Sequence, residues 1–126
     1  MTDARDNRRP AARSVLIVED QYLIADELRI LVERLGNRVL GPVPGVSAAF
    51  ALLAEQRADL ALLDVNLDGE DVYALARVLR ASGTPFAFTT GYGQQAIDPR
   101  FADVPHIEKP VGLPALAETL ERLAPA

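Results

Sequence analysis

Ser14-Val15-Leu16-Ile17-Val18-Glu19-Asp20 is the stretch from which the fold of this 126-residue chain can be worked out. Residues 14–18 are mostly apolar and rich in β-branched side chains, and the run stops abruptly at two acids. A strand that is buried on both faces has this pattern, because neither of its faces alternates with water. We therefore expect a central strand of a parallel sheet here, with Glu19 and Asp20 at its carboxyl end.

Apolar residues at helical spacing follow this strand in residues 24–35, and Gly36 supplies a stop signal. The same alternation continues along the chain, with further strands predicted at 38–43, 60–63, 85–90 and 104–108, and helices near 46–53, 72–79 and 113–123. Ser47 is the expected cap of the helix near 46–53. Alternating strands and helices predict an α/β fold, a doubly wound five-stranded parallel sheet with helices on both faces.

Residues 91–103 depart from this pattern. They include Gly91, Gly93 and Pro99, show little periodicity and offer few apolar side chains. Few buried contacts mean low local stability. We therefore expect the helix between the strands at 85–90 and 104–108, which would be the fourth along the chain, to be short or frayed.

Composition and charge narrow the class of protein. The net charge is −5, yet residues 1–13 carry a net charge of +2, which leaves −7 on the remainder. An acidic body lacks the clustered basic face that DNA binding requires. There are no cysteines, which excludes disulfides and thiolate chemistry.

The expected organisation is a flexible N-terminal arm at 1–13, a single domain at 14–123 and a C-terminal tail at 124–126. No further output domain is expected after the last helix. The N-terminal stretch is polar, and no apolar run is long enough to insert into a membrane. A cytoplasmic location is therefore the expectation.

Polar residues stand where the predicted strands end: Glu19, Asp20, Asp64, Thr90 and Lys109. Because the carboxyl ends of parallel strands share one edge of the sheet, these residues are expected to gather there. Three carboxylates so close together need a cation, and a hard divalent ion such as Mg²⁺ suits oxygen ligands. An ammonium and a hydroxyl beside them can hold phosphoryl oxygens, and an aspartate can serve as the nucleophile.

The order of these residues resembles the response-regulator receiver domain over residues 14–123. Residues 88–92, Phe-Thr-Thr-Gly-Tyr, resemble the Phe-Ala-Thr-Gly-Tyr (FATGY) signature of one receiver subgroup, whose members are often single-domain regulators. Asp64-Val65-Asn66-Leu67 also looks like that subgroup. Thr89 stands where the signature has alanine.

The resemblance implies a flavodoxin-like receiver fold and a role for each site residue. Asp64 would be the phosphoacceptor and would share Mg²⁺ with Asp20 directly, with Glu19 through water and with the backbone carbonyl of Asn66. Thr90 and Lys109 would engage the phosphoryl group. Pro110 would follow Lys109 through a cis bond that aims the lysine, and the Gly91 amide lies where it can meet a phosphoryl oxygen.

The switch residues are expected to differ from those of most receivers. His106 occupies the fifth-strand position at which most receivers carry an aromatic residue. Thr90 would therefore pass the signal to Tyr92, two residues further along, with His106 in a secondary role.

The implied function is that of a stand-alone response regulator in a two-component phosphorelay. A histidine kinase, of the HWE/HisKA2 type by the resemblance, or a phosphotransfer protein would supply the phosphoryl group. The regulator would then contact an unidentified downstream protein or act as a phosphate sink. It would assist its own phosphorylation and dephosphorylation without being a conventional turnover enzyme.

Two alternative functions belong to other classes of protein, a phosphatase and a phosphorylation-independent binding protein. A Mg²⁺-dependent aspartyl-phosphate phosphatase also uses an aspartate nucleophile on a parallel sheet, but it places a second acid two residues later, where this chain has Asn66. A pseudo-receiver binds partners without phosphorylation, and the complete set of Glu19, Asp20, Asp64 and Lys109 argues against it.

Overall fold

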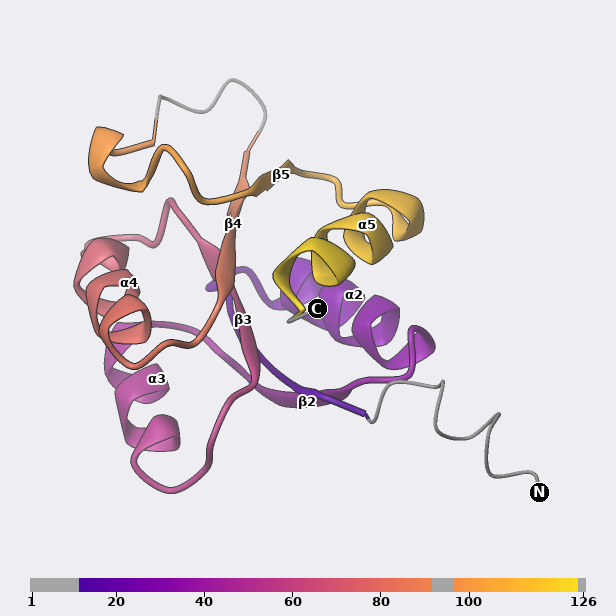
Figure 1. Ribbon diagram of the computed structural model, residues 1–126, viewed down its shortest axis with the longest axis horizontal. Helices are drawn as coiled ribbons and strands as arrows, with labels where there is room; N and C mark the ends of the chain where they lie inside the picture. Colours follow the sequence, from indigo (N-terminus) through magenta and orange to yellow (C-terminus); the bar gives the residue numbers. More distant parts are fainter. Residues whose placement is uncertain (1–11, 92–96, 125–126) are drawn as a thin grey trace.

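A parallel sheet forms the centre of the computed structural model, which describes residues 12–91 and 97–124 (Figure 1). Its strands are β1 (Ser14–Val18), β2 (Arg38–Val43), β3 (Leu60–Asp64), β4 (Phe86–Thr90) and β5 (His106–Glu108). The sheet order is β2-β1-β3-β4-β5, with every neighbouring pair parallel. This is the strand order of flavodoxin-like folds, in which ligand sites lie at the carboxyl ends of the strands.

Helices cover both faces of the sheet. They are α2 (Tyr22–Arg34), α3 (Val46–Leu53), α4 (Val72–Ala81) and α5 (Leu113–Leu123), and one 3-10 turn, η1 (Pro99–Phe101), precedes β5. Helices α3 and α4 lie on one face, and α2 and α5 lie on the other (Figure 1). The doubly wound α/β architecture predicted from the sequence is confirmed.

The strand β1 shows why its sequence is almost continuously apolar. Leu16 and Val18 pack toward α3 and α4, whereas Val15 and Ile17 pack toward α2 and α5. All five residues of β1 are buried. A charge at any of these positions would lose its water without gaining a partner.

The strand β2 lies at the edge of the sheet and contains Pro42. An edge strand tolerates proline because one side of its backbone needs no strand partner. Gly41 precedes it with φ of +92°, and a Cβ at this position would lie 2.7 Å from the Val43 nitrogen. Both observations explain how residues 38–43 form a strand despite an unfavourable composition.

Two helix beginnings differ in their caps. Asp71 accepts a hydrogen bond from the Tyr73 N–H and caps α4 with its own side chain. Helix α3 begins at Val46 after Gly45, so Ser47 lies inside the helix and the expectation that Ser47 is the cap is wrong.

The connection from β4 to β5 contains only the turn η1 among residues 97–105, which agrees with a short fourth helix; residues 92–96 lie outside the described residues. The sparse packing predicted for this connection, however, is not observed in its described residues. Phe101 is 3% exposed and stacks on Tyr73 with ring centroids 5.5 Å apart. The Tyr73 hydroxyl also accepts a hydrogen bond from the Asp98 N–H at 3.1 Å. Helix α4 therefore anchors this connection.

Arg80 of α4 adds to this anchor, and its removal gives a modest test. Its guanidinium lies 4.9 Å from the Phe101 ring centroid and 3.0 Å from Asp103. Because both contacts are partly exposed, Arg80→Ala should lower the free energy of unfolding by only about 1 kcal/mol. Amide exchange at Phe101 and Val104 should become faster. Arg77→Ala, an exposed position on the same helix, should change neither measurement; equal effects of the two variants would contradict the anchoring role.

Little of the two predicted chain ends lies within the described residues. Of the predicted N-terminal arm only residues 12 and 13 are described, and the Arg13 carbonyl accepts a hydrogen bond from the Arg38 N–H at 2.8 Å. The division into arm, domain and tail remains a prediction. None of the described helices has the length and apolar character needed to cross a membrane.

Candidate functional site

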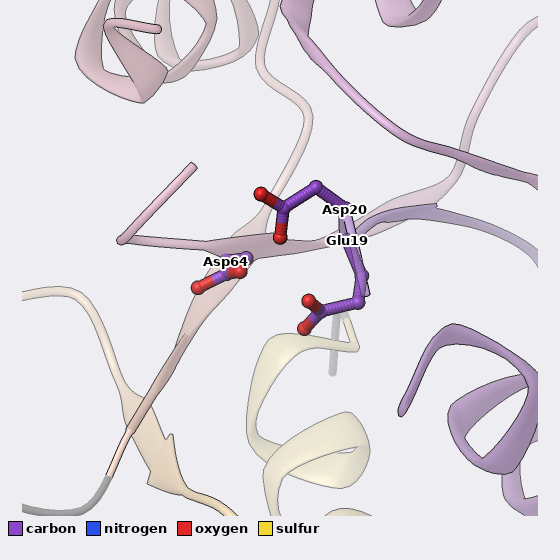
Figure 2. A group of neighbouring side chains, drawn as sticks. All are labelled: Glu19, Asp20 and Asp64. Carbon is purple, nitrogen blue, oxygen red and sulfur yellow. The ribbon is translucent and has the colours of Figure 1, made fainter. Parts of the chain in front are cut away.

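The predicted site residues meet at the carboxyl edge of the sheet. Glu19 and Asp20 follow β1, Asp64 ends β3, Thr90 ends β4 and Lys109 follows β5. Carboxylate oxygens of Glu19, Asp20 and Asp64 all lie within 4.8 Å of one another. Figure 2 shows these three side chains gathered at the ends of the two neighbouring strands. We call these three residues the acidic cluster.

Two members of the acidic cluster are buried. Glu19 and Asp64 are each 2% exposed, whereas Asp20 is exposed. Burial raises the pKa of the Glu19 carboxyl, and its contact with Lys109 opposes this rise. A raised pKa means that the negative charge is costly where it lies. The cluster therefore favours a positive charge beside it.

Lys109 supplies one such charge. Its Nζ lies 2.7 Å from Glu19 Oε1 and 3.3 Å from Asp64 Oδ2, and its side chain is 13% exposed. It is the only lysine in the sequence, where every other basic residue apart from His106 is arginine. The Lys109 N–H donates to the Thr90 carbonyl at 2.7 Å, and the Lys109–Pro110 bond is cis, as expected.

Backbone N–H groups hold each carboxylate of the acidic cluster. Gln21 donates to Glu19 Oε2 at 3.0 Å and Asn66 donates to Asp64 Oδ1 at 2.9 Å. Asp68 donates to Asp20 Oδ2 at 3.2 Å. The loop after β3, residues 65–71, thus bonds to two members of the cluster.

A cavity of about 400 Å³ opens beside the acidic cluster. It lies against α2, and Asp64, Asn66, Gly91, Lys109 and Pro110 contribute to its wall. Although Asp64 is almost fully buried, it lines this cavity, which is large enough for a small chemical group to enter.

The donor set fits a divalent metal ion. Glu19, Asp20 and Asp64 provide only oxygen ligands, which hard cations such as Mg²⁺ prefer. Three ionised carboxylates beside one ammonium leave a formal local charge of −2, which a divalent cation balances. The residues present at the site are therefore compatible with Mg²⁺.

The structure describes two of the three predicted switch residues, Thr90 and His106. Thr90 is buried, and Thr89 beside it is buried as well. His106 is exposed on β5, because its neighbour Ile107 is the residue of that strand that packs against α2 and α5. Tyr92 lies outside the described residues.

Sequence reasoning missed the contributions of Gln21 and Asp68. Both act through backbone N–H groups, which every residue except proline carries, so side-chain identity gives no sign of them. The signal available in the sequence was the position of Asp68 shortly after the predicted nucleophile strand.

Comparison with known proteins agrees with this geometry. The model of the response regulator receiver domain matches residues 15–121, and the chain belongs to this family. It is therefore the receiver domain of a response regulator in two-component signalling, a family in which phosphorylation and Mg²⁺ binding are typical.

Three relatives illustrate the range of the similarity. The solution structure of SdrG from Sphingomonas melonis Fr1 is 38% identical and has a TM-score of 0.82, covering 91% of this chain and 98% of that one. The sensory transduction protein LytT of Bacillus subtilis is 32% identical, over 86% of this chain and 46% of its own length. The phyllosphere-induced regulator PhyR of Methylorubrum extorquens is 36% identical, over 67% of this chain and 33% of its own. This chain spans about half the length of LytT and about a third of the length of PhyR.

Proposed function

We propose that Asp64 of this receiver domain accepts a phosphoryl group from a histidine kinase or a phosphotransfer protein. The observation that carries the proposal is the environment of this carboxylate. It is buried at the end of β3, 3.3 Å from the Lys109 ammonium, and it shares the acidic cluster with Glu19 and Asp20. Such a site concentrates charge where a phosphoryl group needs to be neutralised and positioned.

The transfer is a displacement at phosphorus. An Asp64 oxygen forms the new oxygen–phosphorus bond while the phosphorus–nitrogen bond to the donor histidine breaks, and the bonding electron pair stays on the imidazole nitrogen. The Asn66 N–H holds Asp64 Oδ1 and so orients the carboxylate. The Lys109 ammonium balances charge on the phosphoryl oxygens, and the Thr90 hydroxyl donates a hydrogen bond to one of them.

The metal-binding set would be Asp20 and Asp64 directly, Glu19 through water and the backbone carbonyl of Asn66. When bound there, Mg²⁺ would neutralise negative charge on the phosphoryl oxygens. The hydrogen bond from the Asp68 N–H holds Asp20 at this position. Gly91 lines the same cavity, where its amide can meet the phosphoryl group.

The regulator would act as a stand-alone protein, by contact with a partner or as a phosphate sink. The match to nearly the whole SdrG chain supports this form. A second structure of SdrG, in its BeF3-activated conformation, also matches this chain, with 37% sequence identity and a TM-score of 0.78. The Phe-Thr-Thr-Gly-Tyr run supports the FATGY subgroup and hence a kinase of the HWE/HisKA2 type. Tyr92 and the exposed His106 would report the state of Asp64 to the partner.

The phosphatase alternative has less support. A turnover enzyme needs an acid or base beside the nucleophile, yet Asn66 carries an amide and contributes its backbone N–H to Asp64. Release of many phosphate ions per protein molecule from a small phosphate ester would favour the phosphatase. Absence of any phosphoryl uptake would favour the pseudo-receiver.

The Mg²⁺ requirement gives an experiment on this function. Uptake of phosphate from acetyl phosphate should stop in excess chelator and return with added Mg²⁺. Asp20→Asn should need at least about tenfold more Mg²⁺ for the same rate, because it removes a direct ligand.

Asp26→Asn is the matched control, since it removes an equal charge from an aspartate that pairs with Arg29 at 2.8 Å. Its Mg²⁺ titration should follow that of the unmodified protein. An Asp20→Asn titration equal to that of the control would show that Asp20 only holds the Asp68 loop.

A further inference from the structure

The first turn of α3 is capped from a distant part of the chain. Gly45 precedes the helix and has no side chain with which to cap it. Instead, Glu70 Oε1 accepts a hydrogen bond from the Val46 N–H at 2.5 Å. A carboxylate at this position satisfies an otherwise unpaired donor and interacts favourably with the positive end of the helix dipole.

Gly45 makes room for this contact. A Cβ at position 45 would lie 2.5 Å from Glu70 Oε1 and 3.1 Å from Glu70 Cδ. The backbone of Gly45 is extended, with φ of −167°, so other residues can adopt its conformation. A side chain here would therefore displace the Glu70 carboxylate without straining the backbone.

The loop that carries Glu70 is the one that bonds to Asp64 and Asp20, two members of the acidic cluster. Within residues 65–71, the Asn66 N–H binds Asp64 and the Asp68 N–H binds Asp20. Leu67 between them is buried in the core. Glu70 adds an attachment to α3, two residues after Asp68 and before α4 begins at Val72.

We propose that Glu70 is a positioning residue for the phosphoacceptor site. By joining the loop to α3, it holds the Asn66 and Asp68 backbone against Asp64 and Asp20. This role rests on the proposed function, because its consequence is the affinity of the acidic cluster for Mg²⁺. Glu70 is exposed and does not belong to the acidic cluster.

Two different changes break the same contact. Glu70→Ala removes the carboxylate, and Gly45→Ala displaces it without altering the charge of the protein. Each should weaken Mg²⁺ binding, measured by calorimetry with the metal alone, by about fivefold, the effect of one lost cap of ordinary strength. Amide exchange at Asn66 and Asp68 should become faster in both variants.

The double variant Gly45→Ala with Glu70→Ala should bind Mg²⁺ no more weakly than Glu70→Ala, because the contact can be lost only once. Glu70→Gln keeps an acceptor oxygen and should restore most of the affinity. Asp59→Ala is the matched control: it removes a carboxylate that accepts a backbone N–H, from Ser14 at 2.9 Å, at the opposite end of the sheet. It should lower stability and leave Mg²⁺ binding unchanged.

The outcomes separate this inference from the proposed function. If the unmodified protein neither binds Mg²⁺ nor accepts a phosphoryl group, the proposed function is wrong. If the unmodified protein does both and Glu70→Ala and Gly45→Ala match it, only the role of Glu70 is wrong. Additive losses in the double variant would also overturn that role, since the two residues would then act separately.

Discussion

Lys109→Met is expected to lower the free energy of unfolding in the absence of Mg²⁺ by about 3 kcal/mol, because it leaves buried carboxylates without their cation. The Lys109 Nζ lies 2.7 Å from Glu19 and 3.3 Å from Asp64, and both carboxylates are almost fully buried. Methionine keeps most of the length of the side chain, so the loss reports charge more than packing. Added Mg²⁺ should stabilise the variant more than the unmodified protein.

Urea denaturation with and without Mg²⁺ measures both effects. Arg57→Met removes the same charge from an exposed loop and should change stability by less than about 0.5 kcal/mol. If Lys109→Met is as stable as Arg57→Met without Mg²⁺, the buried ion pairs contribute nothing and the electrostatic account of the site is wrong.

The sheet and the acidic cluster could be predicted because both depend on strong local patterns. Residues 14–18 form a buried strand, and its apolar residues 15–18 pack into the core on both faces of the sheet. Once the sheet is parallel, the residues after each strand must meet at one edge. Glu19, Asp64 and Lys109 are far apart in the sequence, yet their convergence follows from strand direction alone.

What could not be predicted depends on contacts between distant segments. Ser47 has the residue type of a helix cap, but Glu70 from another loop takes this role. Phe101 stands alone in a stretch without periodicity, and its burial depends on Tyr73 and Arg80 of α4. A pattern within one segment contains no information about such partners.

Backbone groups at the site were missed for a related reason. The N–H groups of Gln21 and Asp68 hold Glu19 and Asp20, but their positions depend on the course of the loops. The exposure of His106 likewise depends on the pleat of β5, in which Ile107 is the residue that faces the core.

Asp64→Asn is expected to abolish uptake of a phosphoryl group. The amide has nearly the shape of the carboxylate and can still accept the Asn66 N–H, but it lacks the negative oxygen that attacks phosphorus. The fold should persist, because the change removes one of three neighbouring carboxylates and so reduces their mutual repulsion. Asp103→Asn, at an exposed carboxylate in the connection before β5, should accept the phosphoryl group like the unmodified protein.

Intact-mass spectrometry after incubation with acetyl phosphate and Mg²⁺ measures whether Asp64 accepts a phosphoryl group. The unmodified protein and Asp103→Asn should gain the mass of one phosphoryl group, and Asp64→Asn should gain none. A phosphoryl group on Asp64→Asn would assign the reaction to another residue, and its absence from the unmodified protein would contradict the proposed function itself.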